Sequence, residues 1–216
     1  MRFPNAAAGV KKIFTAEILT LIAAIATLIS TILLVVTLGA AASGSKGGTI
    51  AAGGFTAILF VAAGIVGIVA FIMSIVGISN ASKDEPTFKT ALICVIVGII
   101  GSLVASIFSG NAVVSSIGSL VTNVANLFVT IFVITGIIRL ADQLNNAEVG
   151  NKGNNILKMI IAISVLAIIA NLIVLIMGGR VSVVAGIIAI VAAVLEIVQY
   201  IMYLSFLSNA KAMLAE

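Results

Sequence analysis

The sequence contains no histidine, one cysteine and two prolines, and charged residues make up only 8% of its 216 positions. Histidine is the commonest general base, and histidine and cysteine supply most ligands of zinc, copper, haem and iron–sulfur centres. Their scarcity argues against metal centres and acid–base catalysis, and the lone Cys94 excludes a disulfide within the chain. We therefore expect no cofactor, no metal and no enzymatic activity.

The low charge content also separates this chain from soluble proteins, which carry about 25% charged residues. Here 62% of the residues are hydrophobic and the mean hydropathy is +1.37. The net charge of +4 comes from short Lys and Arg clusters between apolar runs, so nucleic-acid binding has no support. The expected environment is a lipid bilayer, and we expect the cytoplasmic membrane of a bacterium.

Six apolar runs are each long enough to cross a bilayer as a helix, which takes about 20 residues. The runs cover residues 13–42, 49–78, 88–109, 115–140, 155–178 and 181–208. Glycine, asparagine, acidic residues and Pro86 separate them. The sequence therefore predicts an all-α polytopic protein in which residues 1–216 form a single transmembrane domain.

The distribution of Lys and Arg predicts how these spans are oriented, because cytoplasmic flanks are enriched in both residues. When the loops, together with the adjoining ends of the runs, are assigned alternately to the two sides, nine Lys and Arg fall on one side. Only Lys46 and Arg180 fall on the other. The side with nine holds both ends of the chain, so both termini are predicted to be cytoplasmic.

The chain also shows signs of an internal repeat of helical hairpins. The segment 77–83 (GISNASK) resembles 207–211 (LSNAK), and residues 140–142 form a fainter copy. Three tandem hairpins in the same orientation would have repeat units 11–83, 88–142 and 155–211. The alternative is that short cytoplasmic loops converge on Asn, Ser and Lys by composition, and the sequence leaves both interpretations open.

Small residues at helical spacing predict the faces through which the spans pack. Helices in lipid associate by close backbone approach at small residues and by interhelical hydrogen bonds. The third run has Gly98, Ser102, Ser106 and Gly110 at four-residue spacing; the second has Ala63 and Gly67, and the sixth has Gly186. These faces could pack within the chain, against a second copy or against a membrane partner subunit.

Polar residues form stripes at alternating three- and four-residue spacing, which keeps them on one face of a helix. The candidates are Thr20 and Thr27 in the first run, Asn123 and Asn126 in the fourth, Asn171 in the fifth, and Glu196, Tyr200 and Tyr203 in the sixth. The stripes could line a polar path. Alternatively, hydroxyls bond to their own helix and amides connect neighbouring helices. We expect the second behaviour for Thr, and both remain open for the asparagines.

Glu196 is the most unusual of these residues, because a carboxylate well inside a span costs at least about 2.5 kcal/mol when ionised. No Lys or Arg occupies the central part of any predicted span, so we expect a neutral, hydrogen-bonded Glu196. The favoured function is that of a structural or interaction protein that packs with itself or a partner through small-residue faces. The alternative is a channel or small-solute or ion transporter with a polar path along the first, fourth and sixth helices and Glu196.

Overall fold

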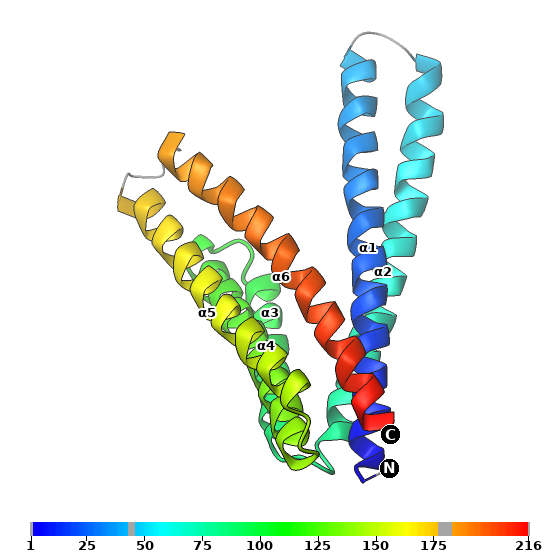
Figure 1. Cartoon of the computed structure of the whole chain (residues 1–216). Helices are drawn as coiled ribbons and strands as arrows, with labels where there is room; N and C mark the ends of the chain where they lie inside the picture. Colours follow the sequence, from blue (N-terminus) through cyan, green and yellow to red (C-terminus); the bar gives the residue numbers. More distant parts are fainter. Residues whose placement is uncertain (1, 43–45, 177–182, 216) are drawn as a thin grey trace. The chain divides into compact units, whose positions relative to one another are not determined.

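The computed structural model describes residues 2–42, 46–176 and 183–215, which form six α-helices (Figure 1). Side chains are described for residues 2–30, 33, 56–111, 113–115, 117–164, 195 and 198–215. The helices are α1 (Pro4–Ala42), α2 (Lys46–Ala81), α3 (Thr87–Ile107), α4 (Ala112–Gln143), α5 (Ala147–Ile176) and α6 (Val183–Ala215). The described ranges contain no strand, which confirms the all-α class.

Four helical segments among the described residues are long and apolar enough to cross a membrane. They cover Pro4–Ser30, Thr56–Ala81, Thr87–Ile107 and Val113–Gln143. The 21 residues of α3 rise about 31 Å, which matches the thickness of about 30 Å of a hydrocarbon core. These helices are those of an integral membrane protein.

The chain divides into two compact units, which are described separately. The two-helix unit comprises residues 11–77, which include most of α1 and α2. The four-helix unit comprises residues 1–10 and 78–216 and therefore contains α3 to α6 together with the first turns of α1. Both chain ends lie at the same end of the four-helix unit (Figure 1).

Helices α3 and α4 form an antiparallel hairpin whose backbones approach closely at glycines. A Cβ at Gly101 would lie 3.0 Å from the carbonyl oxygen of Gly118, and a Cβ at Gly118 would lie 2.7 Å from the backbone nitrogen of Ala105. Nearer the other end, a Cβ at Gly136 would lie 2.7 Å from the fully buried ring of Phe88. The glycines therefore fix how closely the two helices pack.

A three-residue turn, 144–146, connects α4 to α5, and α5 starts earlier than predicted. Asn145 adopts a left-handed conformation (φ 55°), and the N–H of Asn146 donates to the carbonyl of Ala141 at 2.8 Å, a common helix ending. The Asn146 side chain then accepts from the N–H of Val149 and caps the new helix. The predicted start at residue 155 is corrected to Ala147, because the polar segment before the apolar run is helical.

The start of α1 is also earlier than the sequence predicts, at Pro4 instead of residue 13. Proline suits a first helical position because its missing N–H needs no partner. The carboxylate of Asp84 accepts hydrogen bonds from the Asn5 side chain and from the N–H of Ala6, both at 2.8 Å. A residue distant in sequence thus accepts from a backbone N–H of this helix end, which a prediction from local sequence does not see.

In the two-helix unit, the buried face of α2 has a seven-residue period. Thr56, Ala63, Ala70 and Gly77 are buried. Ala63 therefore lies on a packed face, as the sequence predicts. Gly67 is half-buried and has no described atom within 4 Å of its Cβ position, so close approach does not occur there. A seven-residue step stays on one side of the helix, whereas a run of four-residue steps rotates away by about 40° per step.

Candidate functional site

A cluster of polar side chains lies on one side of the α3–α4 hairpin, and we call it the amide face. It consists of Ser102 on α3 and Ser119, Thr122, Asn123 and Asn126 on α4. The spacing of the four α4 residues places them within about 100° of one another around the helix. Ser102 joins them because its hydroxyl lies 3.3 Å from that of Thr122.

The amide face lies at the depth of the membrane centre. The Oδ1 atom of Asn126 is 3.6 Å from the Cβ position of Gly98, which stands in the middle of the 21-residue helix α3. Because α3 is as long as a bilayer core is thick, the midplane of a membrane that α3 crosses would lie near Gly98. Asn126 would then be a midplane carboxamide, and Asn123 lies about one turn from it towards the α3–α4 loop.

Both carboxamides are exposed and have no side-chain hydrogen bond to any other described residue. Their surroundings are apolar and exposed as well: Leu120 and Val124 on α4 and Ile99 on α3 are 63%, 44% and 37% exposed. Placing an amide in an apolar medium without a partner costs roughly 2 to 7 kcal/mol. This face therefore needs a polar partner in the membrane, and that requirement makes it the candidate site.

Hydroxyls behave differently from amides in this structure. Thr122 donates to the carbonyl of Gly118 in its own helix at 3.0 Å and also lies 3.3 Å from the carbonyl of Gly98 across the hairpin. In α1, Thr20 and Thr27 are exposed, and their hydroxyls donate to the carbonyls of Ala16 and Ala23. The prediction that the threonine hydroxyls bond to their own helix is thus confirmed at these positions.

The predicted packing line of α3 is only partly the observed one. Gly98 is buried against α4, but Ser102, Ser106 and Gly110 are exposed, and no described atom lies within 4 Å of the Cβ position of Gly110. Close approach follows Gly98, Gly101 and Ala105 instead. Residues spaced alternately by three and four positions stay on one side of a helix. Residues spaced by four positions each time rotate around the helix axis, by about 120° after three such spacings.

The remaining predicted site residues belong to α2, α5 and α6. Tyr203 is buried and Tyr200 is half-buried on α6, and both make contacts there. The side chains of Glu196, Asn171 and Gly186 lie outside the described residues. Within the described part of the four-helix unit, Asn123 and Asn126 share one face of α4, and their side chains make no hydrogen bond with either tyrosine.

A second polar cluster, which the sequence did not lead us to expect, surrounds Glu85 in the loop before α3. The Glu85 side chain is 5% exposed and accepts from the hydroxyl of Thr87 at 2.6 Å and from its N–H at 3.2 Å. Arg139 and Gln143 of α4 each lie 3.5 Å from its carboxylate. The sequence does contain a weak indication of this cluster. Glu85 stands at the start of one predicted helix, and Arg139 and Gln143 stand four positions apart near the end of the next.

The Glu85 cluster connects helix ends. Its partners are a hydroxyl, an amide and a guanidinium, which hold the carboxylate in place. No group of three or more His, Cys, Asp or Glu residues that could hold a metal occurs among the described residues. Comparison of the chain with models of known protein families, with curated proteins and with solved structures finds no match.

Proposed function

We propose that this protein is a non-enzymatic membrane component that assembles with further copies of itself through the amide face of the α3–α4 hairpin. The observation that carries the proposal is the pair of carboxamides of Asn123 and Asn126 near the middle of the α3–α4 hairpin, which are exposed and have no side-chain hydrogen-bond partner among the described residues. A lipid tail offers no hydrogen bond, so the membrane itself leaves these groups unsatisfied. A second protein surface would satisfy them.

Carboxamides suit association between identical chains. Each one has two N–H donors and a carbonyl acceptor, so an amide is complementary to another amide. In a two-fold interface the same patch occurs on both sides, and Asn126 of one copy faces the corresponding region of the other. Ser102 and Thr122 beside it add two small hydroxyl residues, which allow close approach.

The full proposal places six spans in the membrane with both termini in the cytoplasm. The nine-to-two distribution of Lys and Arg supports this orientation. Both termini lie at the same end of the four-helix unit, as an even number of spans requires (Figure 1). Reporters fused after Glu216 and inserted in the loop 108–111 should then label opposite sides of the membrane. Labelling of the same side would contradict the orientation.

The assembly is tested by counting subunits of the labelled protein in liposomes at decreasing ratios of protein to lipid. We expect oligomers that persist at ratios where random co-occupancy predicts single chains. A matched control is Thr20→Val, which removes an exposed hydroxyl already bonded to Ala16 in its own helix. Monomers at every ratio would refute self-assembly. The partner of the amide face would then be another part of the same chain or a different protein.

The second candidate function, a channel or solute transporter, is favoured by the same exposed amides. Several amide faces around a common axis would form a polar lining at the midplane, where hydroxyls and amides replace water around a solute. In that case Asn126→Leu abolishes solute flux through reconstituted vesicles, and Glu196→Gln alters its pH dependence. Vesicles in which neither substitution changes flux for any ion or small solute would count against transport.

A further inference from the structure

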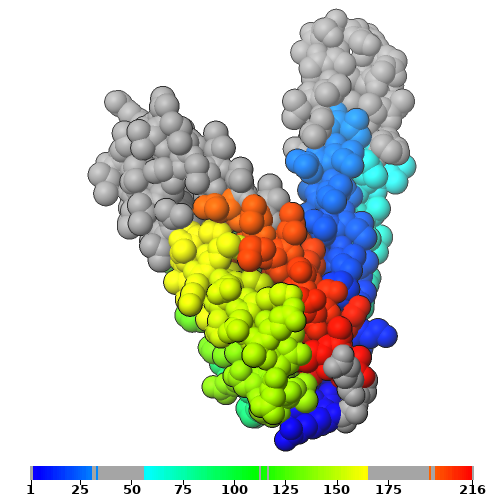
Figure 2. Space-filling view, in the orientation of Figure 1, coloured from blue at the N-terminus to red at the C-terminus, as the bar shows by residue number. Residues whose placement is uncertain are grey.

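Helices α5 and α6 enclose a groove of about 320 Å³ on the surface of the four-helix unit. Figure 2 shows the described surfaces of these two helices side by side. The lining consists of Lys152, Asn155 and Ile156 of α5 and Ile201, Met202 and Ser205 of α6, together with Phe206. Polar groups and apolar groups therefore share one depression.

The floor of the groove is rigidly packed. Phe206 and Ile156 are buried, with 1% and 2% of their surfaces exposed. A Cβ at Gly153 would lie 3.0 Å from the Phe206 ring and 2.5 Å from Ile138 of α4, so three helices meet directly beneath it. The walls, by contrast, are open, because Ile201 and Met202 are 63% and 38% exposed. The groove is a preformed surface depression with an exposed apolar wall.

The groove extends across the boundary between the polar start of α5 and its apolar part. Lys152 precedes the apolar run that begins near residue 155, whereas Ile156 lies one turn deeper. On α6, which runs antiparallel, Ile201 lies one turn deeper than Ser205. In the proposed six-span topology, on which this inference rests, the charged and hydroxyl groups lie at headgroup depth and the apolar wall begins the hydrocarbon layer.

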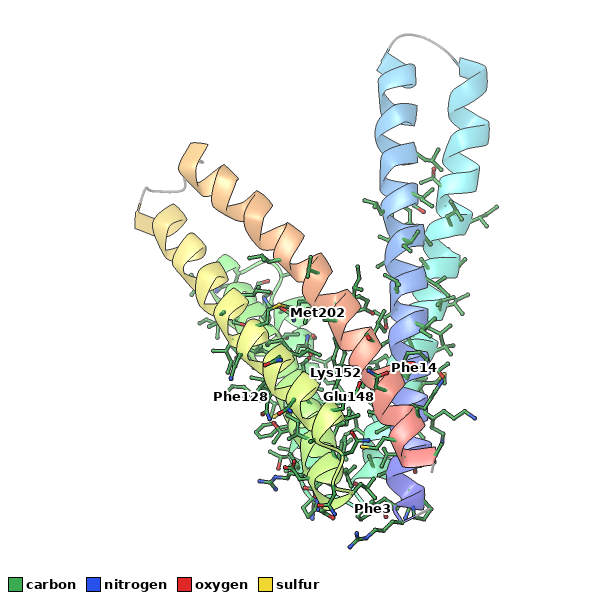
Figure 3. All side chains as sticks on the ribbon, in the orientation of Figure 1. Phe3, Phe14, Phe128, Glu148, Lys152 and Met202 are labelled. Carbon is green, nitrogen blue, oxygen red and sulfur yellow. The ribbon has the colours of Figure 1, made fainter. Side chains whose placement is uncertain are left out.

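An acidic group lies outside the groove lining, one turn from Lys152 towards the start of α5. Glu148 accepts a hydrogen bond from Lys152 at 2.7 Å, and the two side chains are 76% and 45% exposed. Hydrogen bonding and the charge of Lys152 hold the pKa of Glu148 below its ordinary value, so the carboxylate is ionised at neutral pH. Figure 3 shows Met202, Lys152 and Glu148 in that order towards the end that carries the chain termini.

This order of groups matches one class of lipid. In a phospholipid with an ethanolamine headgroup, the acyl chains lie deepest, the phosphate follows, and the primary ammonium is outermost. We propose that the α5–α6 groove binds a phosphatidylethanolamine molecule, with its phosphate at Lys152, its ammonium at Glu148 and an acyl chain against Ile201 and Met202. The exposed Glu148–Lys152 pair is weak and opens to accept the headgroup charges.

The charge pattern distinguishes this occupant from an anionic lipid. A headgroup with a phosphate and no cation would meet Lys152 but would also meet the negative charge of Glu148. A phosphatidylcholine headgroup has a cation without N–H donors, so it forms no hydrogen bond with the carboxylate. The groove should therefore prefer ethanolamine over both alternatives. This inference is independent of the amide face.

Native mass spectrometry of the purified full chain tests the inference with three lipids of identical acyl chains, phosphatidylethanolamine, phosphatidylglycerol and phosphatidylcholine. We expect the ethanolamine lipid to bind at least fivefold more tightly than either other lipid. Lys152→Gln should weaken its binding at least fivefold. Glu148→Gln should remove the preference over phosphatidylglycerol. Lys158→Gln, an exposed lysine of α5 that does not line the groove, should change neither value.

Three outcomes would overturn the assignment. The first is an ethanolamine preference that persists in Glu148→Gln. The second is binding that Lys152→Gln leaves unchanged. The third is equal competition by glycerophosphoethanolamine, which lacks acyl chains, because the apolar wall would then have no role. Both substituted side chains are exposed, and circular dichroism of each variant verifies that the helices are intact. Ser205→Phe, which fills the groove, should abolish binding while leaving both charges in place.

Discussion

Replacing both midplane carboxamides by a near-isosteric apolar residue should separate the copies of this protein. The double variant Asn123→Leu with Asn126→Leu keeps the side-chain shape and removes every amide from the amide face. In a two-fold interface, two copies contribute four amides. With about 0.6 kcal/mol for each interhelical hydrogen bond, one bond for each amide amounts to about 2.4 kcal/mol, or about a sixtyfold weaker association.

The appropriate assay is energy transfer between labelled chains in liposomes as the protein is diluted with lipid. The midpoint of dissociation should shift by about sixtyfold in the double variant and remain in place in Thr20→Val. In a second assay, the free energy of unfolding of the same variants is measured on monomers in mixed micelles. If the amides face lipid, their replacement should stabilise the monomer and leave association unchanged. That combination of results would refute the reasoning.

Further predictions concern packing, the buried carboxylate and the surface ion pair. Gly118→Ala should lower the free energy of unfolding in mixed micelles by about 1–3 kcal/mol, because the new Cβ meets the α3 backbone at 2.7 Å, whereas Gly64→Ala meets no described atom within 4 Å and should not destabilise. Equal effects of the two substitutions would contradict the proposed close approach. Glu85→Ala should cost about 1–3 kcal/mol in the same assay, since it leaves a buried hydroxyl without its acceptor; an unchanged unfolding curve would show that the cluster does not stabilise the fold. Lys152→Gln should raise the pKa of Glu148 towards its ordinary value in an NMR titration. The stabilising effect of this pair is therefore present above the ordinary carboxyl pKa and is lost as the pH falls through the lowered one, and a Glu148 pKa that does not move would disprove the pairing.

The sequence predicts the helices well because span length and composition are local properties. Apolar runs longer than a bilayer is thick become helices wherever they occur, since no other open structure satisfies backbone groups in lipid. The ends were less predictable. The start of α1 depends on Asp84, which lies far away in sequence, and the start of α5 depends on a cap by Asn146 in a segment with two glycines. Residues 4–12 and 147–154 lie outside the apolar runs, so hydropathy alone predicts loops there.

The candidate site was predictable in its residues but not in its geometry. The spacing of Asn123 and Asn126 indicates a common polar face, and the structure adds their depth, which comes from the contact of Asn126 with Gly98. The packing face of α3 could not be predicted without knowing where α4 lies. Gly98 belongs both to the four-residue series that continues with Ser102 and to the series that continues with Gly101, and the close approach to α4 follows only the second. Glu85 was overlooked for the same reason: its partners Arg139 and Gln143 belong to another helix.

The most direct measurement of the central claim is disulfide crosslinking in native membranes. A single cysteine is placed by Ser119→Cys, which keeps both carboxamides of the amide face, in a background where Cys94→Ala removes the native thiol. Oxidation should produce a covalent dimer from this variant but not from Ile100→Cys, which lies on the opposite side of α3 from Ser102 and is 56% exposed. A crosslink at residue 119 alone would support assembly through the amide face. Monomers from the Ser119→Cys chain, or equal dimer yields from both variants, would contradict it.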